Sequence, residues 1–164
     1  MLKIAHLGPT GTYTEAAALA YAQSALSDTD FCLQPYANIA RTLQAVASGE
    51  AVLGIVPVEN SIEGSVTMTA DTIWQLDAPL QIHQAIVLSI RHALISIATD
   101  LNQIELVYSH PQALSQCQEW LQQYLPQADR VSANSTTAAL TTLATLPHAA
   151  AISSVRAAKL YNFP

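Results

Sequence analysis

The chain has few charged residues and only two cysteines, and each shortage excludes a class of protein. Charged residues make up 11% of the 164 residues and hydrophobic residues 51%, a balance that excludes an intrinsically disordered chain. The six Lys and Arg residues are scattered among twelve Asp and Glu, and the formal net charge of -6 argues against nucleic acid as a partner. Cys32 and Cys117 belong to no metal-ligand spacing and the five histidines do not cluster, so we expect no metal.

Long apolar runs are also missing from the sequence. No run approaches the roughly 18 residues that a membrane span needs, and residues 1–7 are typical of a strand, not of a signal peptide. We therefore expect a cytoplasmic protein with no membrane partner. A length of 164 residues is enough for one core or for two small lobes.

The first half of the chain alternates between strand and helix patterns. Strands are predicted at residues 3–7, 31–33 and 52–58, and helices begin at Thr12, Asn38 and about Ser65. Thr12 and Glu15 have the spacing of a capping box. Three strand–helix units in a row predict a parallel sheet with crossover helices.

The pattern changes after Pro79. Residues 80–97 are rich in Ile and Leu with almost no helical spacing, which predicts an extended segment that carries the chain into a second lobe. We expect a first α/β lobe over residues 1–80 and a second over residues 81–164. The second lobe is predicted to hold strands at 105–108, 130–132 and 149–152, each followed by a helix; the first of these helices opens at Pro111 and presents Leu114, Cys117, Leu121 and Tyr124 on one face.

Short polar side chains gather where the predicted strands end and the helices begin. They are Thr10-Gly11-Thr12, Asn60-Ser61 with Gly64-Ser65, Ser109-His110, and Ser135-Thr136. Ligands of open α/β folds bind at the carboxyl ends of strands, and a helix N-terminus binds carboxylate or phosphate without Lys or Arg. The alternative is that these residues are ordinary helix caps.

Individual residues of these junctions allow two interpretations each. Glu59 and Glu63 are either an acid and base pair or a turn residue and a solvated carboxylate. His110 is either a base or a residue that opens a helix. Gln112 and Gln116 lie on one helical side, where they either bind a ligand or belong to a run of surface glutamines. The Gly8 to Gly11 turn matches neither a Walker loop nor a dinucleotide fingerprint, so we expect no cofactor.

Five segments together resemble the catalytic domain of prephenate dehydratase, in the same order along the chain. They are residues 8–15 (GPTGTYTE), 56–64 (VPVENSIEG), 108–117 (YSHPQALSQC), 135–139 (STTAA), and 151–154 (AISS) with 157–161 (AAKLY). The resemblance implies an α/β fold of two lobes, similar to type II periplasmic binding proteins, with a cleft between the lobes. It also implies a lyase that converts prephenate to phenylpyruvate, with loss of water and carbon dioxide, in phenylalanine biosynthesis.

The resemblance also implies roles for particular residues. Asn60 and Gln116 are the candidate catalytic residues, which hydrogen-bond the substrate, while helix N-termini hold its carboxylates. The candidate substrate-binding residues are Thr10, Thr12, Ser61, Gly64, Ser109, His110, Gln112, Ser135 and Thr136. Prephenate is a dianion whose ring becomes aromatic as the two groups leave, so the reaction needs no metal or redox cofactor.

Two departures from the family pattern stand out. Gln84-Ala85 replaces a Gly-Glu pair, and the Thr-Arg-Phe motif, whose threonine is thought to assist departure of the hydroxyl, does not occur in the 164 residues. Neither does the regulatory ACT domain. We therefore expect a truncated enzyme that is inactive or weak alone, with an open sheet edge that favours a homodimer or higher homo-oligomer.

Two other function classes use the same fold. A noncatalytic module would capture a small carboxylate in the cleft and release it unchanged. A secreted solute-binding protein would need an export signal, whereas Met1 begins directly in a predicted strand.

Overall fold

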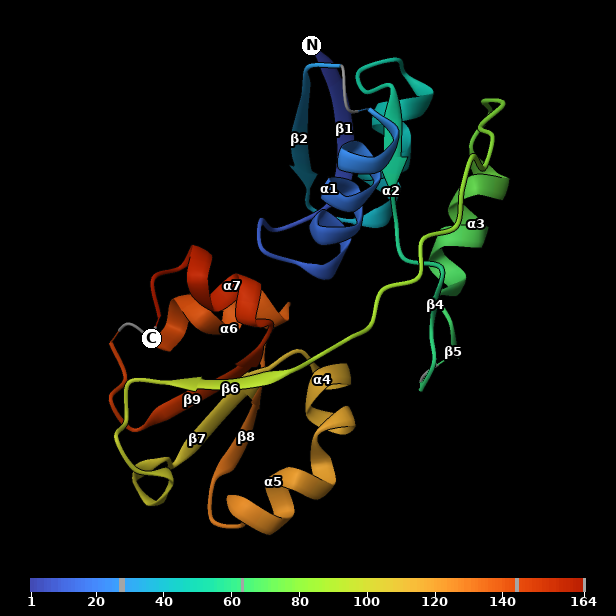
Figure 1. Ribbon diagram of the computed structural model, residues 1–164. Coiled ribbons are helices and arrows are strands. Elements are labelled where there is room, and N and C mark those ends of the chain that lie inside the picture. Colours follow the sequence, from blue (N-terminus) through green and yellow to red (C-terminus); the bar gives the residue numbers. More distant parts are fainter. Residues whose placement is uncertain (27–28, 63, 144, 164) are drawn as a thin grey trace. The chain divides into compact units, whose positions relative to one another are not determined.

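The computed structural model of the chain describes residues 1–26, 29–62, 64–143 and 145–163. These residues divide into two compact units, Met1–Ser89 and Ile90–Pro164, which we call unit 1 and unit 2. Each unit combines strands with helices that lie next to them in the chain (Figure 1). The predicted α/β class is confirmed.

Unit 1 contains a three-stranded parallel sheet. β1 (Leu2–Leu7) lies between β2 (Phe31–Tyr36) and β3 (Leu53–Ile55), and both pairings are parallel. α1 (Tyr13–Ala25) connects β1 to β2, and α2 (Ile39–Ala47) connects β2 to β3. The predicted parallel sheet with crossover helices is confirmed for these residues.

The two crossover helices of unit 1 cover opposite faces of the sheet. Successive side chains of a strand point to opposite sides, and β1 buries an apolar residue on each side. Ile4 is fully buried against Ala18 and Ala22 of α1, whereas Ala5 packs with Ala45 of α2. Burial on both faces makes β1 the centre of this unit.

The segment after β3 differs from the prediction of a strand over residues 52–58, a polar turn and a helix from about Ser65. β4 (Glu59–Asn60) pairs antiparallel with β5 (Gly64–Ser65), and the Val66 N–H donates to the Val58 carbonyl at 2.8 Å. The residues predicted to start the helix are therefore engaged in a hairpin, and α3 (Thr67–Gln75) begins two residues later.

The predicted extended segment follows α3. Residues 76–92, all of them described, belong to no helix or strand, in agreement with the lack of helical spacing in the sequence. The division between unit 1 and unit 2 falls within this segment.

Unit 2 contains a mixed four-stranded sheet in the order β6-β9-β7-β8. Its strands are β6 (Ala93–Ser96), β7 (Leu106–Ser109), β8 (Asp129–Ser132) and β9 (Ala149–Ser153). β7 is parallel to β8 and β9, whereas β6 is antiparallel to β9. The three later strands match the predicted ones to within a residue or two.

The helices of unit 2 follow these strands. They are α4 (Pro111–Gln116), α5 (Gln118–Tyr124), α6 (Thr136–Leu143) and α7 (Val155–Leu160), with a short 3-10 turn at Leu101–Gln103. The prediction of a single helix after Pro111 was wrong, because the backbone at Cys117 (φ -100°, ψ 9°) leaves the α-helical region and separates α4 from α5. No helix among the described residues is long and apolar enough to cross a lipid bilayer.

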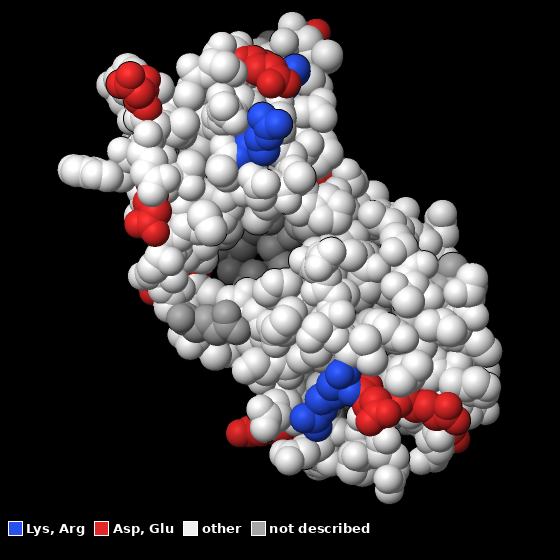
Figure 2. Space-filling model, turned by 180° about the vertical axis from the view of Figure 1, so that it is seen from behind, with Lys and Arg blue, Asp and Glu red and all other residues white. Residues whose placement is uncertain are grey.

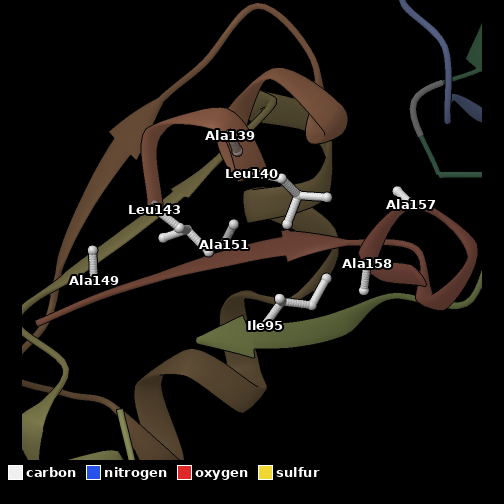
Figure 3. Close-up of a cluster of buried hydrophobic side chains, with 8 residues drawn as sticks. All are labelled: Ile95, Ala139, Leu140, Leu143, Ala149, Ala151, Ala157 and Ala158. Atoms are coloured by element: carbon white, nitrogen blue, oxygen red, sulfur yellow. The ribbon is translucent and has the colours of Figure 1, made fainter. Parts of the chain in front are cut away.

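Two apolar layers enclose the sheet of unit 2. On one side, side chains of α6 and α7 meet those of β6 and β9 (Figure 3); the buried residues are Ile95, Ala139, Leu140, Leu143, Ala149, Ala151, Ala157 and Ala158. On the other side, Leu114 of α4 and Leu121 of α5 pack against Val107 and Ile152. The many small alanine side chains allow the helices to pack closely on the strands.

Candidate functional site

One edge of the unit 2 sheet collects the beginnings of three helices. β7, β8 and β9 are mutually parallel in register, so their last residues, Ser109, Ser132 and Ser153, lie at the same edge. The chain enters α4, α6 and α7 directly after these strands. The positive ends of the helix dipoles therefore gather at this edge, which suits a negatively charged ligand.

The turn between β7 and α4 contains three of the candidate residues. Ser109 is fully buried and its Oγ donates to the Ile152 carbonyl of β9 at 2.7 Å. His110 is the N-cap of α4, and its Nδ1 accepts a hydrogen bond from the Gln112 N–H at 3.2 Å. Both contacts support the interpretation that this turn caps a helix. The binding roles of Ser109, His110 and Gln112 stay predictions.

The turn between β8 and α6 contains the next two candidates. Ser135 Oγ accepts a hydrogen bond from the Ala138 N–H at 2.9 Å, and Thr136 is the first residue of α6. Thr137 and Ser153 are both fully buried, and within the described part of the chain neither hydroxyl has a hydrogen-bond partner. A buried hydroxyl without a partner costs about 1–3 kcal/mol.

Gln116 lies one helical turn beyond Gln112, at the end of α4. Its Oε1 is 2.6 Å from Nε2 of His92, the residue before β6. Both side chains are half-buried. Since an amide oxygen only accepts, His92 Nε2 carries the proton and donates.

The turn between β1 and α1 in unit 1 contains Thr10 and Thr12. Thr12 is the N-cap of α1: its Oγ1 accepts from the Glu15 N–H at 3.3 Å and donates to the Leu7 carbonyl at 3.1 Å. The buried Glu15 carboxylate accepts from the Gly11 N–H at 2.8 Å, one residue before the position expected for a capping box. Thr10 is exposed at the tip of the turn.

The remaining candidates lie in the β4–β5 hairpin of unit 1. Asn60 Oδ1 accepts a hydrogen bond from the Ile62 N–H at 3.0 Å, which shapes the turn. Asn60 pairs with Gly64, whose φ of +82° favours glycine, and Ser61 is exposed between them. Glu59 is exposed, and Glu63 lies outside the described residues, so the suggested acid and base pair stays a hypothesis.

Comparison with known proteins decides the family of the chain. The family model described as prephenate dehydratase matches residues 4–164, nearly the whole sequence. The chain belongs to the prephenate dehydratase family. The resemblance inferred from the five motifs is thereby confirmed.

Curated relatives of this prephenate dehydratase family member are longer than the chain. The bifunctional chorismate mutase/prephenate dehydratase of Pseudomonas aeruginosa is 38% identical over 98% of this chain, which covers 42% of that protein. The prephenate dehydratase of Lactococcus lactis subsp. cremoris is 36% identical over 98% of this chain, which covers 56% of that protein. The chain thus spans about half the length of the curated relatives that it matches.

Solved structures share the fold of this family member. The prephenate dehydratase of Arthrobacter aurescens, in complex with L-Phe, superposes with a TM-score of 0.75 at 34% identity, covering 97% of this chain and 51% of that one. The prephenate dehydratase of Staphylococcus aureus superposes with a TM-score of 0.77 at 32% identity, covering 99% of this chain and 58% of that one. The expectation of a prephenate dehydratase fold is confirmed.

Charged groups are sparse on one face of this prephenate dehydratase family member. On the face shown in Figure 2, Lys and Arg atoms lie in a few separate places beside Asp and Glu atoms, and most of the surface belongs to uncharged residues. Burial raises the pKa of the Cys117 thiol next to Gln116, so this cysteine stays protonated and is a poor nucleophile. No group of three or more His, Cys, Asp or Glu among the described residues has a geometry that could hold a metal ion.

Two residues of the site region were not among the candidates selected from the sequence of this family member. Ser154 caps α7, where its Oγ accepts from the Ala157 N–H at 3.0 Å; the AISS motif contained the signal, since a serine after a strand is a common cap. His92 lies in the extended segment and has no motif around it. Only its contact with Gln116, 24 residues further along, identifies it.

Proposed function

We propose that this chain forms part of a prephenate dehydratase, a carbon–oxygen lyase that converts prephenate to phenylpyruvate with loss of water and carbon dioxide. The observation that carries the proposal is the gathering of the α4, α6 and α7 N-termini at one edge of the unit 2 sheet. Family membership over residues 4–164 supports the identity of the substrate.

The chemistry of prephenate matches the groups at this edge. The substrate carries two carboxylates, and helix N-termini bind carboxylates through N–H groups and the helix dipole. The hydroxyl-bearing residues Ser135 and Thr136 stand at the start of α6, an eight-residue helix. Recognition by fixed dipoles requires no lysine or arginine in the site, in agreement with the low charge of the chain.

We propose that the amide of Gln116 hydrogen-bonds the substrate, and the same role for the amide of Asn60 stays a separate prediction. Neither amide can serve as an acid, so neither supplies the proton that the departing hydroxyl needs. The family's Thr-Arg-Phe threonine is absent from the 164 residues. We therefore propose that these amides orient prephenate and that a different group supplies the proton.

Calorimetry with prephenate and phenylpyruvate tests binding, and the ultraviolet absorbance of phenylpyruvate tests turnover. The proposal predicts saturable binding of prephenate that Gln116→Met weakens, because methionine keeps the length of the side chain but has no N–H donors. Gln122→Met is the matched control, since Gln122 is an exposed glutamine of α5. Equal affinity in both variants, or no binding by the parent protein, would contradict the proposal.

A noncatalytic module that captures a small carboxylate is the second candidate function, because the helix N-termini at the unit 2 sheet edge suit such a ligand whether or not a reaction follows. A chimera that joins residues 1–164 to the remaining C-terminal part of the Lactococcus lactis relative distinguishes the two. A dehydratase predicts phenylpyruvate formation by the chimera and its loss with Gln116→Met. A chimera that binds prephenate and leaves it unchanged indicates the module.

We also propose that the protein is a cytoplasmic homo-oligomer, most simply a dimer. In the described part of unit 1, β2 and β3 each have one sheet neighbour, and open strand edges favour pairing with another chain. Sedimentation velocity over a range of protein concentrations tests this proposal. A single species with the mass of one chain at all concentrations would contradict it.

A further inference from the structure

The side chain of Gln116 is tied to a residue from a different part of unit 2. His92 precedes β6, and Gln116 ends α4; their side chains meet at 2.6 Å between Nε2 and Oε1. A free glutamine side chain samples many rotamers, and holding it in one costs roughly 1.5–2 kcal/mol of conformational entropy. Because the contact with His92 already orders the Gln116 side chain in the folded protein, ligand binding does not have to supply this entropy.

The polarity of the contact determines which end of the amide is engaged. Oε1 accepts from His92, so the N–H donors of Gln116 lie on the other branch of the amide. An anionic ligand requires donors, and an amide turned by 180° would present its oxygen to a carboxylate. The partner of Oε1 therefore selects the useful orientation of Gln116.

The backbone next to His92 is itself fixed. Ala93 pairs with Ser153, the last residue of β9, so β6 starts at the sheet edge where α4, α6 and α7 begin. The imidazole is half-buried, which shields the hydrogen bond from competing water. His92 thus reaches Gln116 from a rigid strand.

We infer that His92 is a positioning residue, which holds the Gln116 amide so that its N–H groups serve an anionic substrate. The inference rests on the proposed function, because it assigns His92 a part in prephenate binding through Gln116. His92 does not itself contact the substrate in this proposal.

Substitutions at His92 test the inference by calorimetry with prephenate. His92→Leu removes the donor and should weaken binding about tenfold, equal to ~1.4 kcal/mol. His92→Gln places an amide N–H close to the position of Nε2 and should restore affinity to within about threefold of the parent protein. His148→Leu changes an exposed histidine of unit 2 and should leave affinity unchanged.

A double-mutant cycle separates positioning from a general structural effect. In a Gln116→Met background, His92→Leu should weaken binding no further. An equal loss in both backgrounds, or a failure of His92→Gln to restore affinity at unchanged thermal stability, would overturn the inference.

NMR relaxation of the Gln116 side-chain amide tests positioning without a ligand. The order parameter of that amide should fall in His92→Leu and recover in His92→Gln. If the amide order does not change, the positioning role is wrong. If the parent protein shows an ordered amide but binds no prephenate, the proposed function is wrong while the structural relation stands.

Discussion

The hydroxyl of Ser109 makes one contact whose removal should destabilise unit 2 by a predictable amount. The β7–β9 ladder pairs Tyr108 with Ala151, and the bond from Ser109 Oγ to the Ile152 carbonyl (2.7 Å) extends this connection to the end of the strand. Ser109→Ala removes one fully buried hydrogen bond and almost no volume. The expected loss is about 1 kcal/mol, rising to ~3 kcal/mol if the carbonyl loses a needed partner.

Fluorescence can assign this loss to unit 2, because the chain has two tryptophans and each unit contains one, Trp74 in unit 1 and Trp120 in unit 2. In a Trp74→Phe background, urea unfolding followed by Trp120 emission should show a lower midpoint for Ser109→Ala at an unchanged slope. In a thermal scan, the transition of a unit of this size should move by about 4–8 °C per kcal/mol.

Ser115→Ala serves as the matched control, since Ser115 is an exposed serine of α4 in the same unit. Its effect should stay within about 0.5 kcal/mol. If Ser109→Ala unfolds at the same midpoint as its parent, the hydroxyl does not join β7 to β9 with the strength inferred here.

Three further perturbations have defined outcomes. The hydrogen bond to Glu50, with burial and the nearby negative charge, raises the pKa of Tyr36 to about 12, and spectrophotometric titration of Glu50→Gln should show Tyr36 ionising at lower pH. The same hydrogen bond lowers the pKa of Glu50. The ionised Glu50 therefore stabilises the fold above its unfolded pKa of about 4.3, and this stabilisation disappears as the pH falls through the lower folded pKa. In acid unfolding, the stability of Glu50→Gln should therefore depend less on pH than that of the parent protein. A Cβ on Gly54 would lie 2.8 Å from Val46 Cγ2, so Gly54→Ala should destabilise unit 1 by about 1–3 kcal/mol in urea, and Val46→Ala should recover part of this loss in the double variant. Leu140→Ala removes a fully buried side chain of the α6 layer and should lower the free energy of unfolding by about 2–5 kcal/mol in the same measurement.

The parts of the fold that depend on local interactions could be predicted from the sequence. Thr12, Asn38 and Ser135 each hydrogen-bond to a backbone N–H three residues ahead, so the signal and the helix that it starts lie within one turn. Alternating strand and helix patterns likewise predicted the parallel sheet of unit 1. Five short motifs, read in order, identified the family.

Two short features were not predicted from the sequence, although both are local. The hairpin of β4 and β5 uses two residues from each strand, too few to show an alternating pattern. The break at Cys117 separates two short helices that pack in the same apolar layer, a division that helical spacing does not reveal.

Some features of the candidate site follow from the sequence alone, whereas others depend on the tertiary structure. The sequence by itself determined which residue types stand at the strand ends and helix starts, because caps and turns act over three or four residues. The tertiary structure alone decided that Ser109 donates to β9 and that His92 holds Gln116, since these bonds join residues 43 and 24 positions apart. No spacing rule encodes such pairs, because they exist only when the strands are laid side by side and the helices are packed on them.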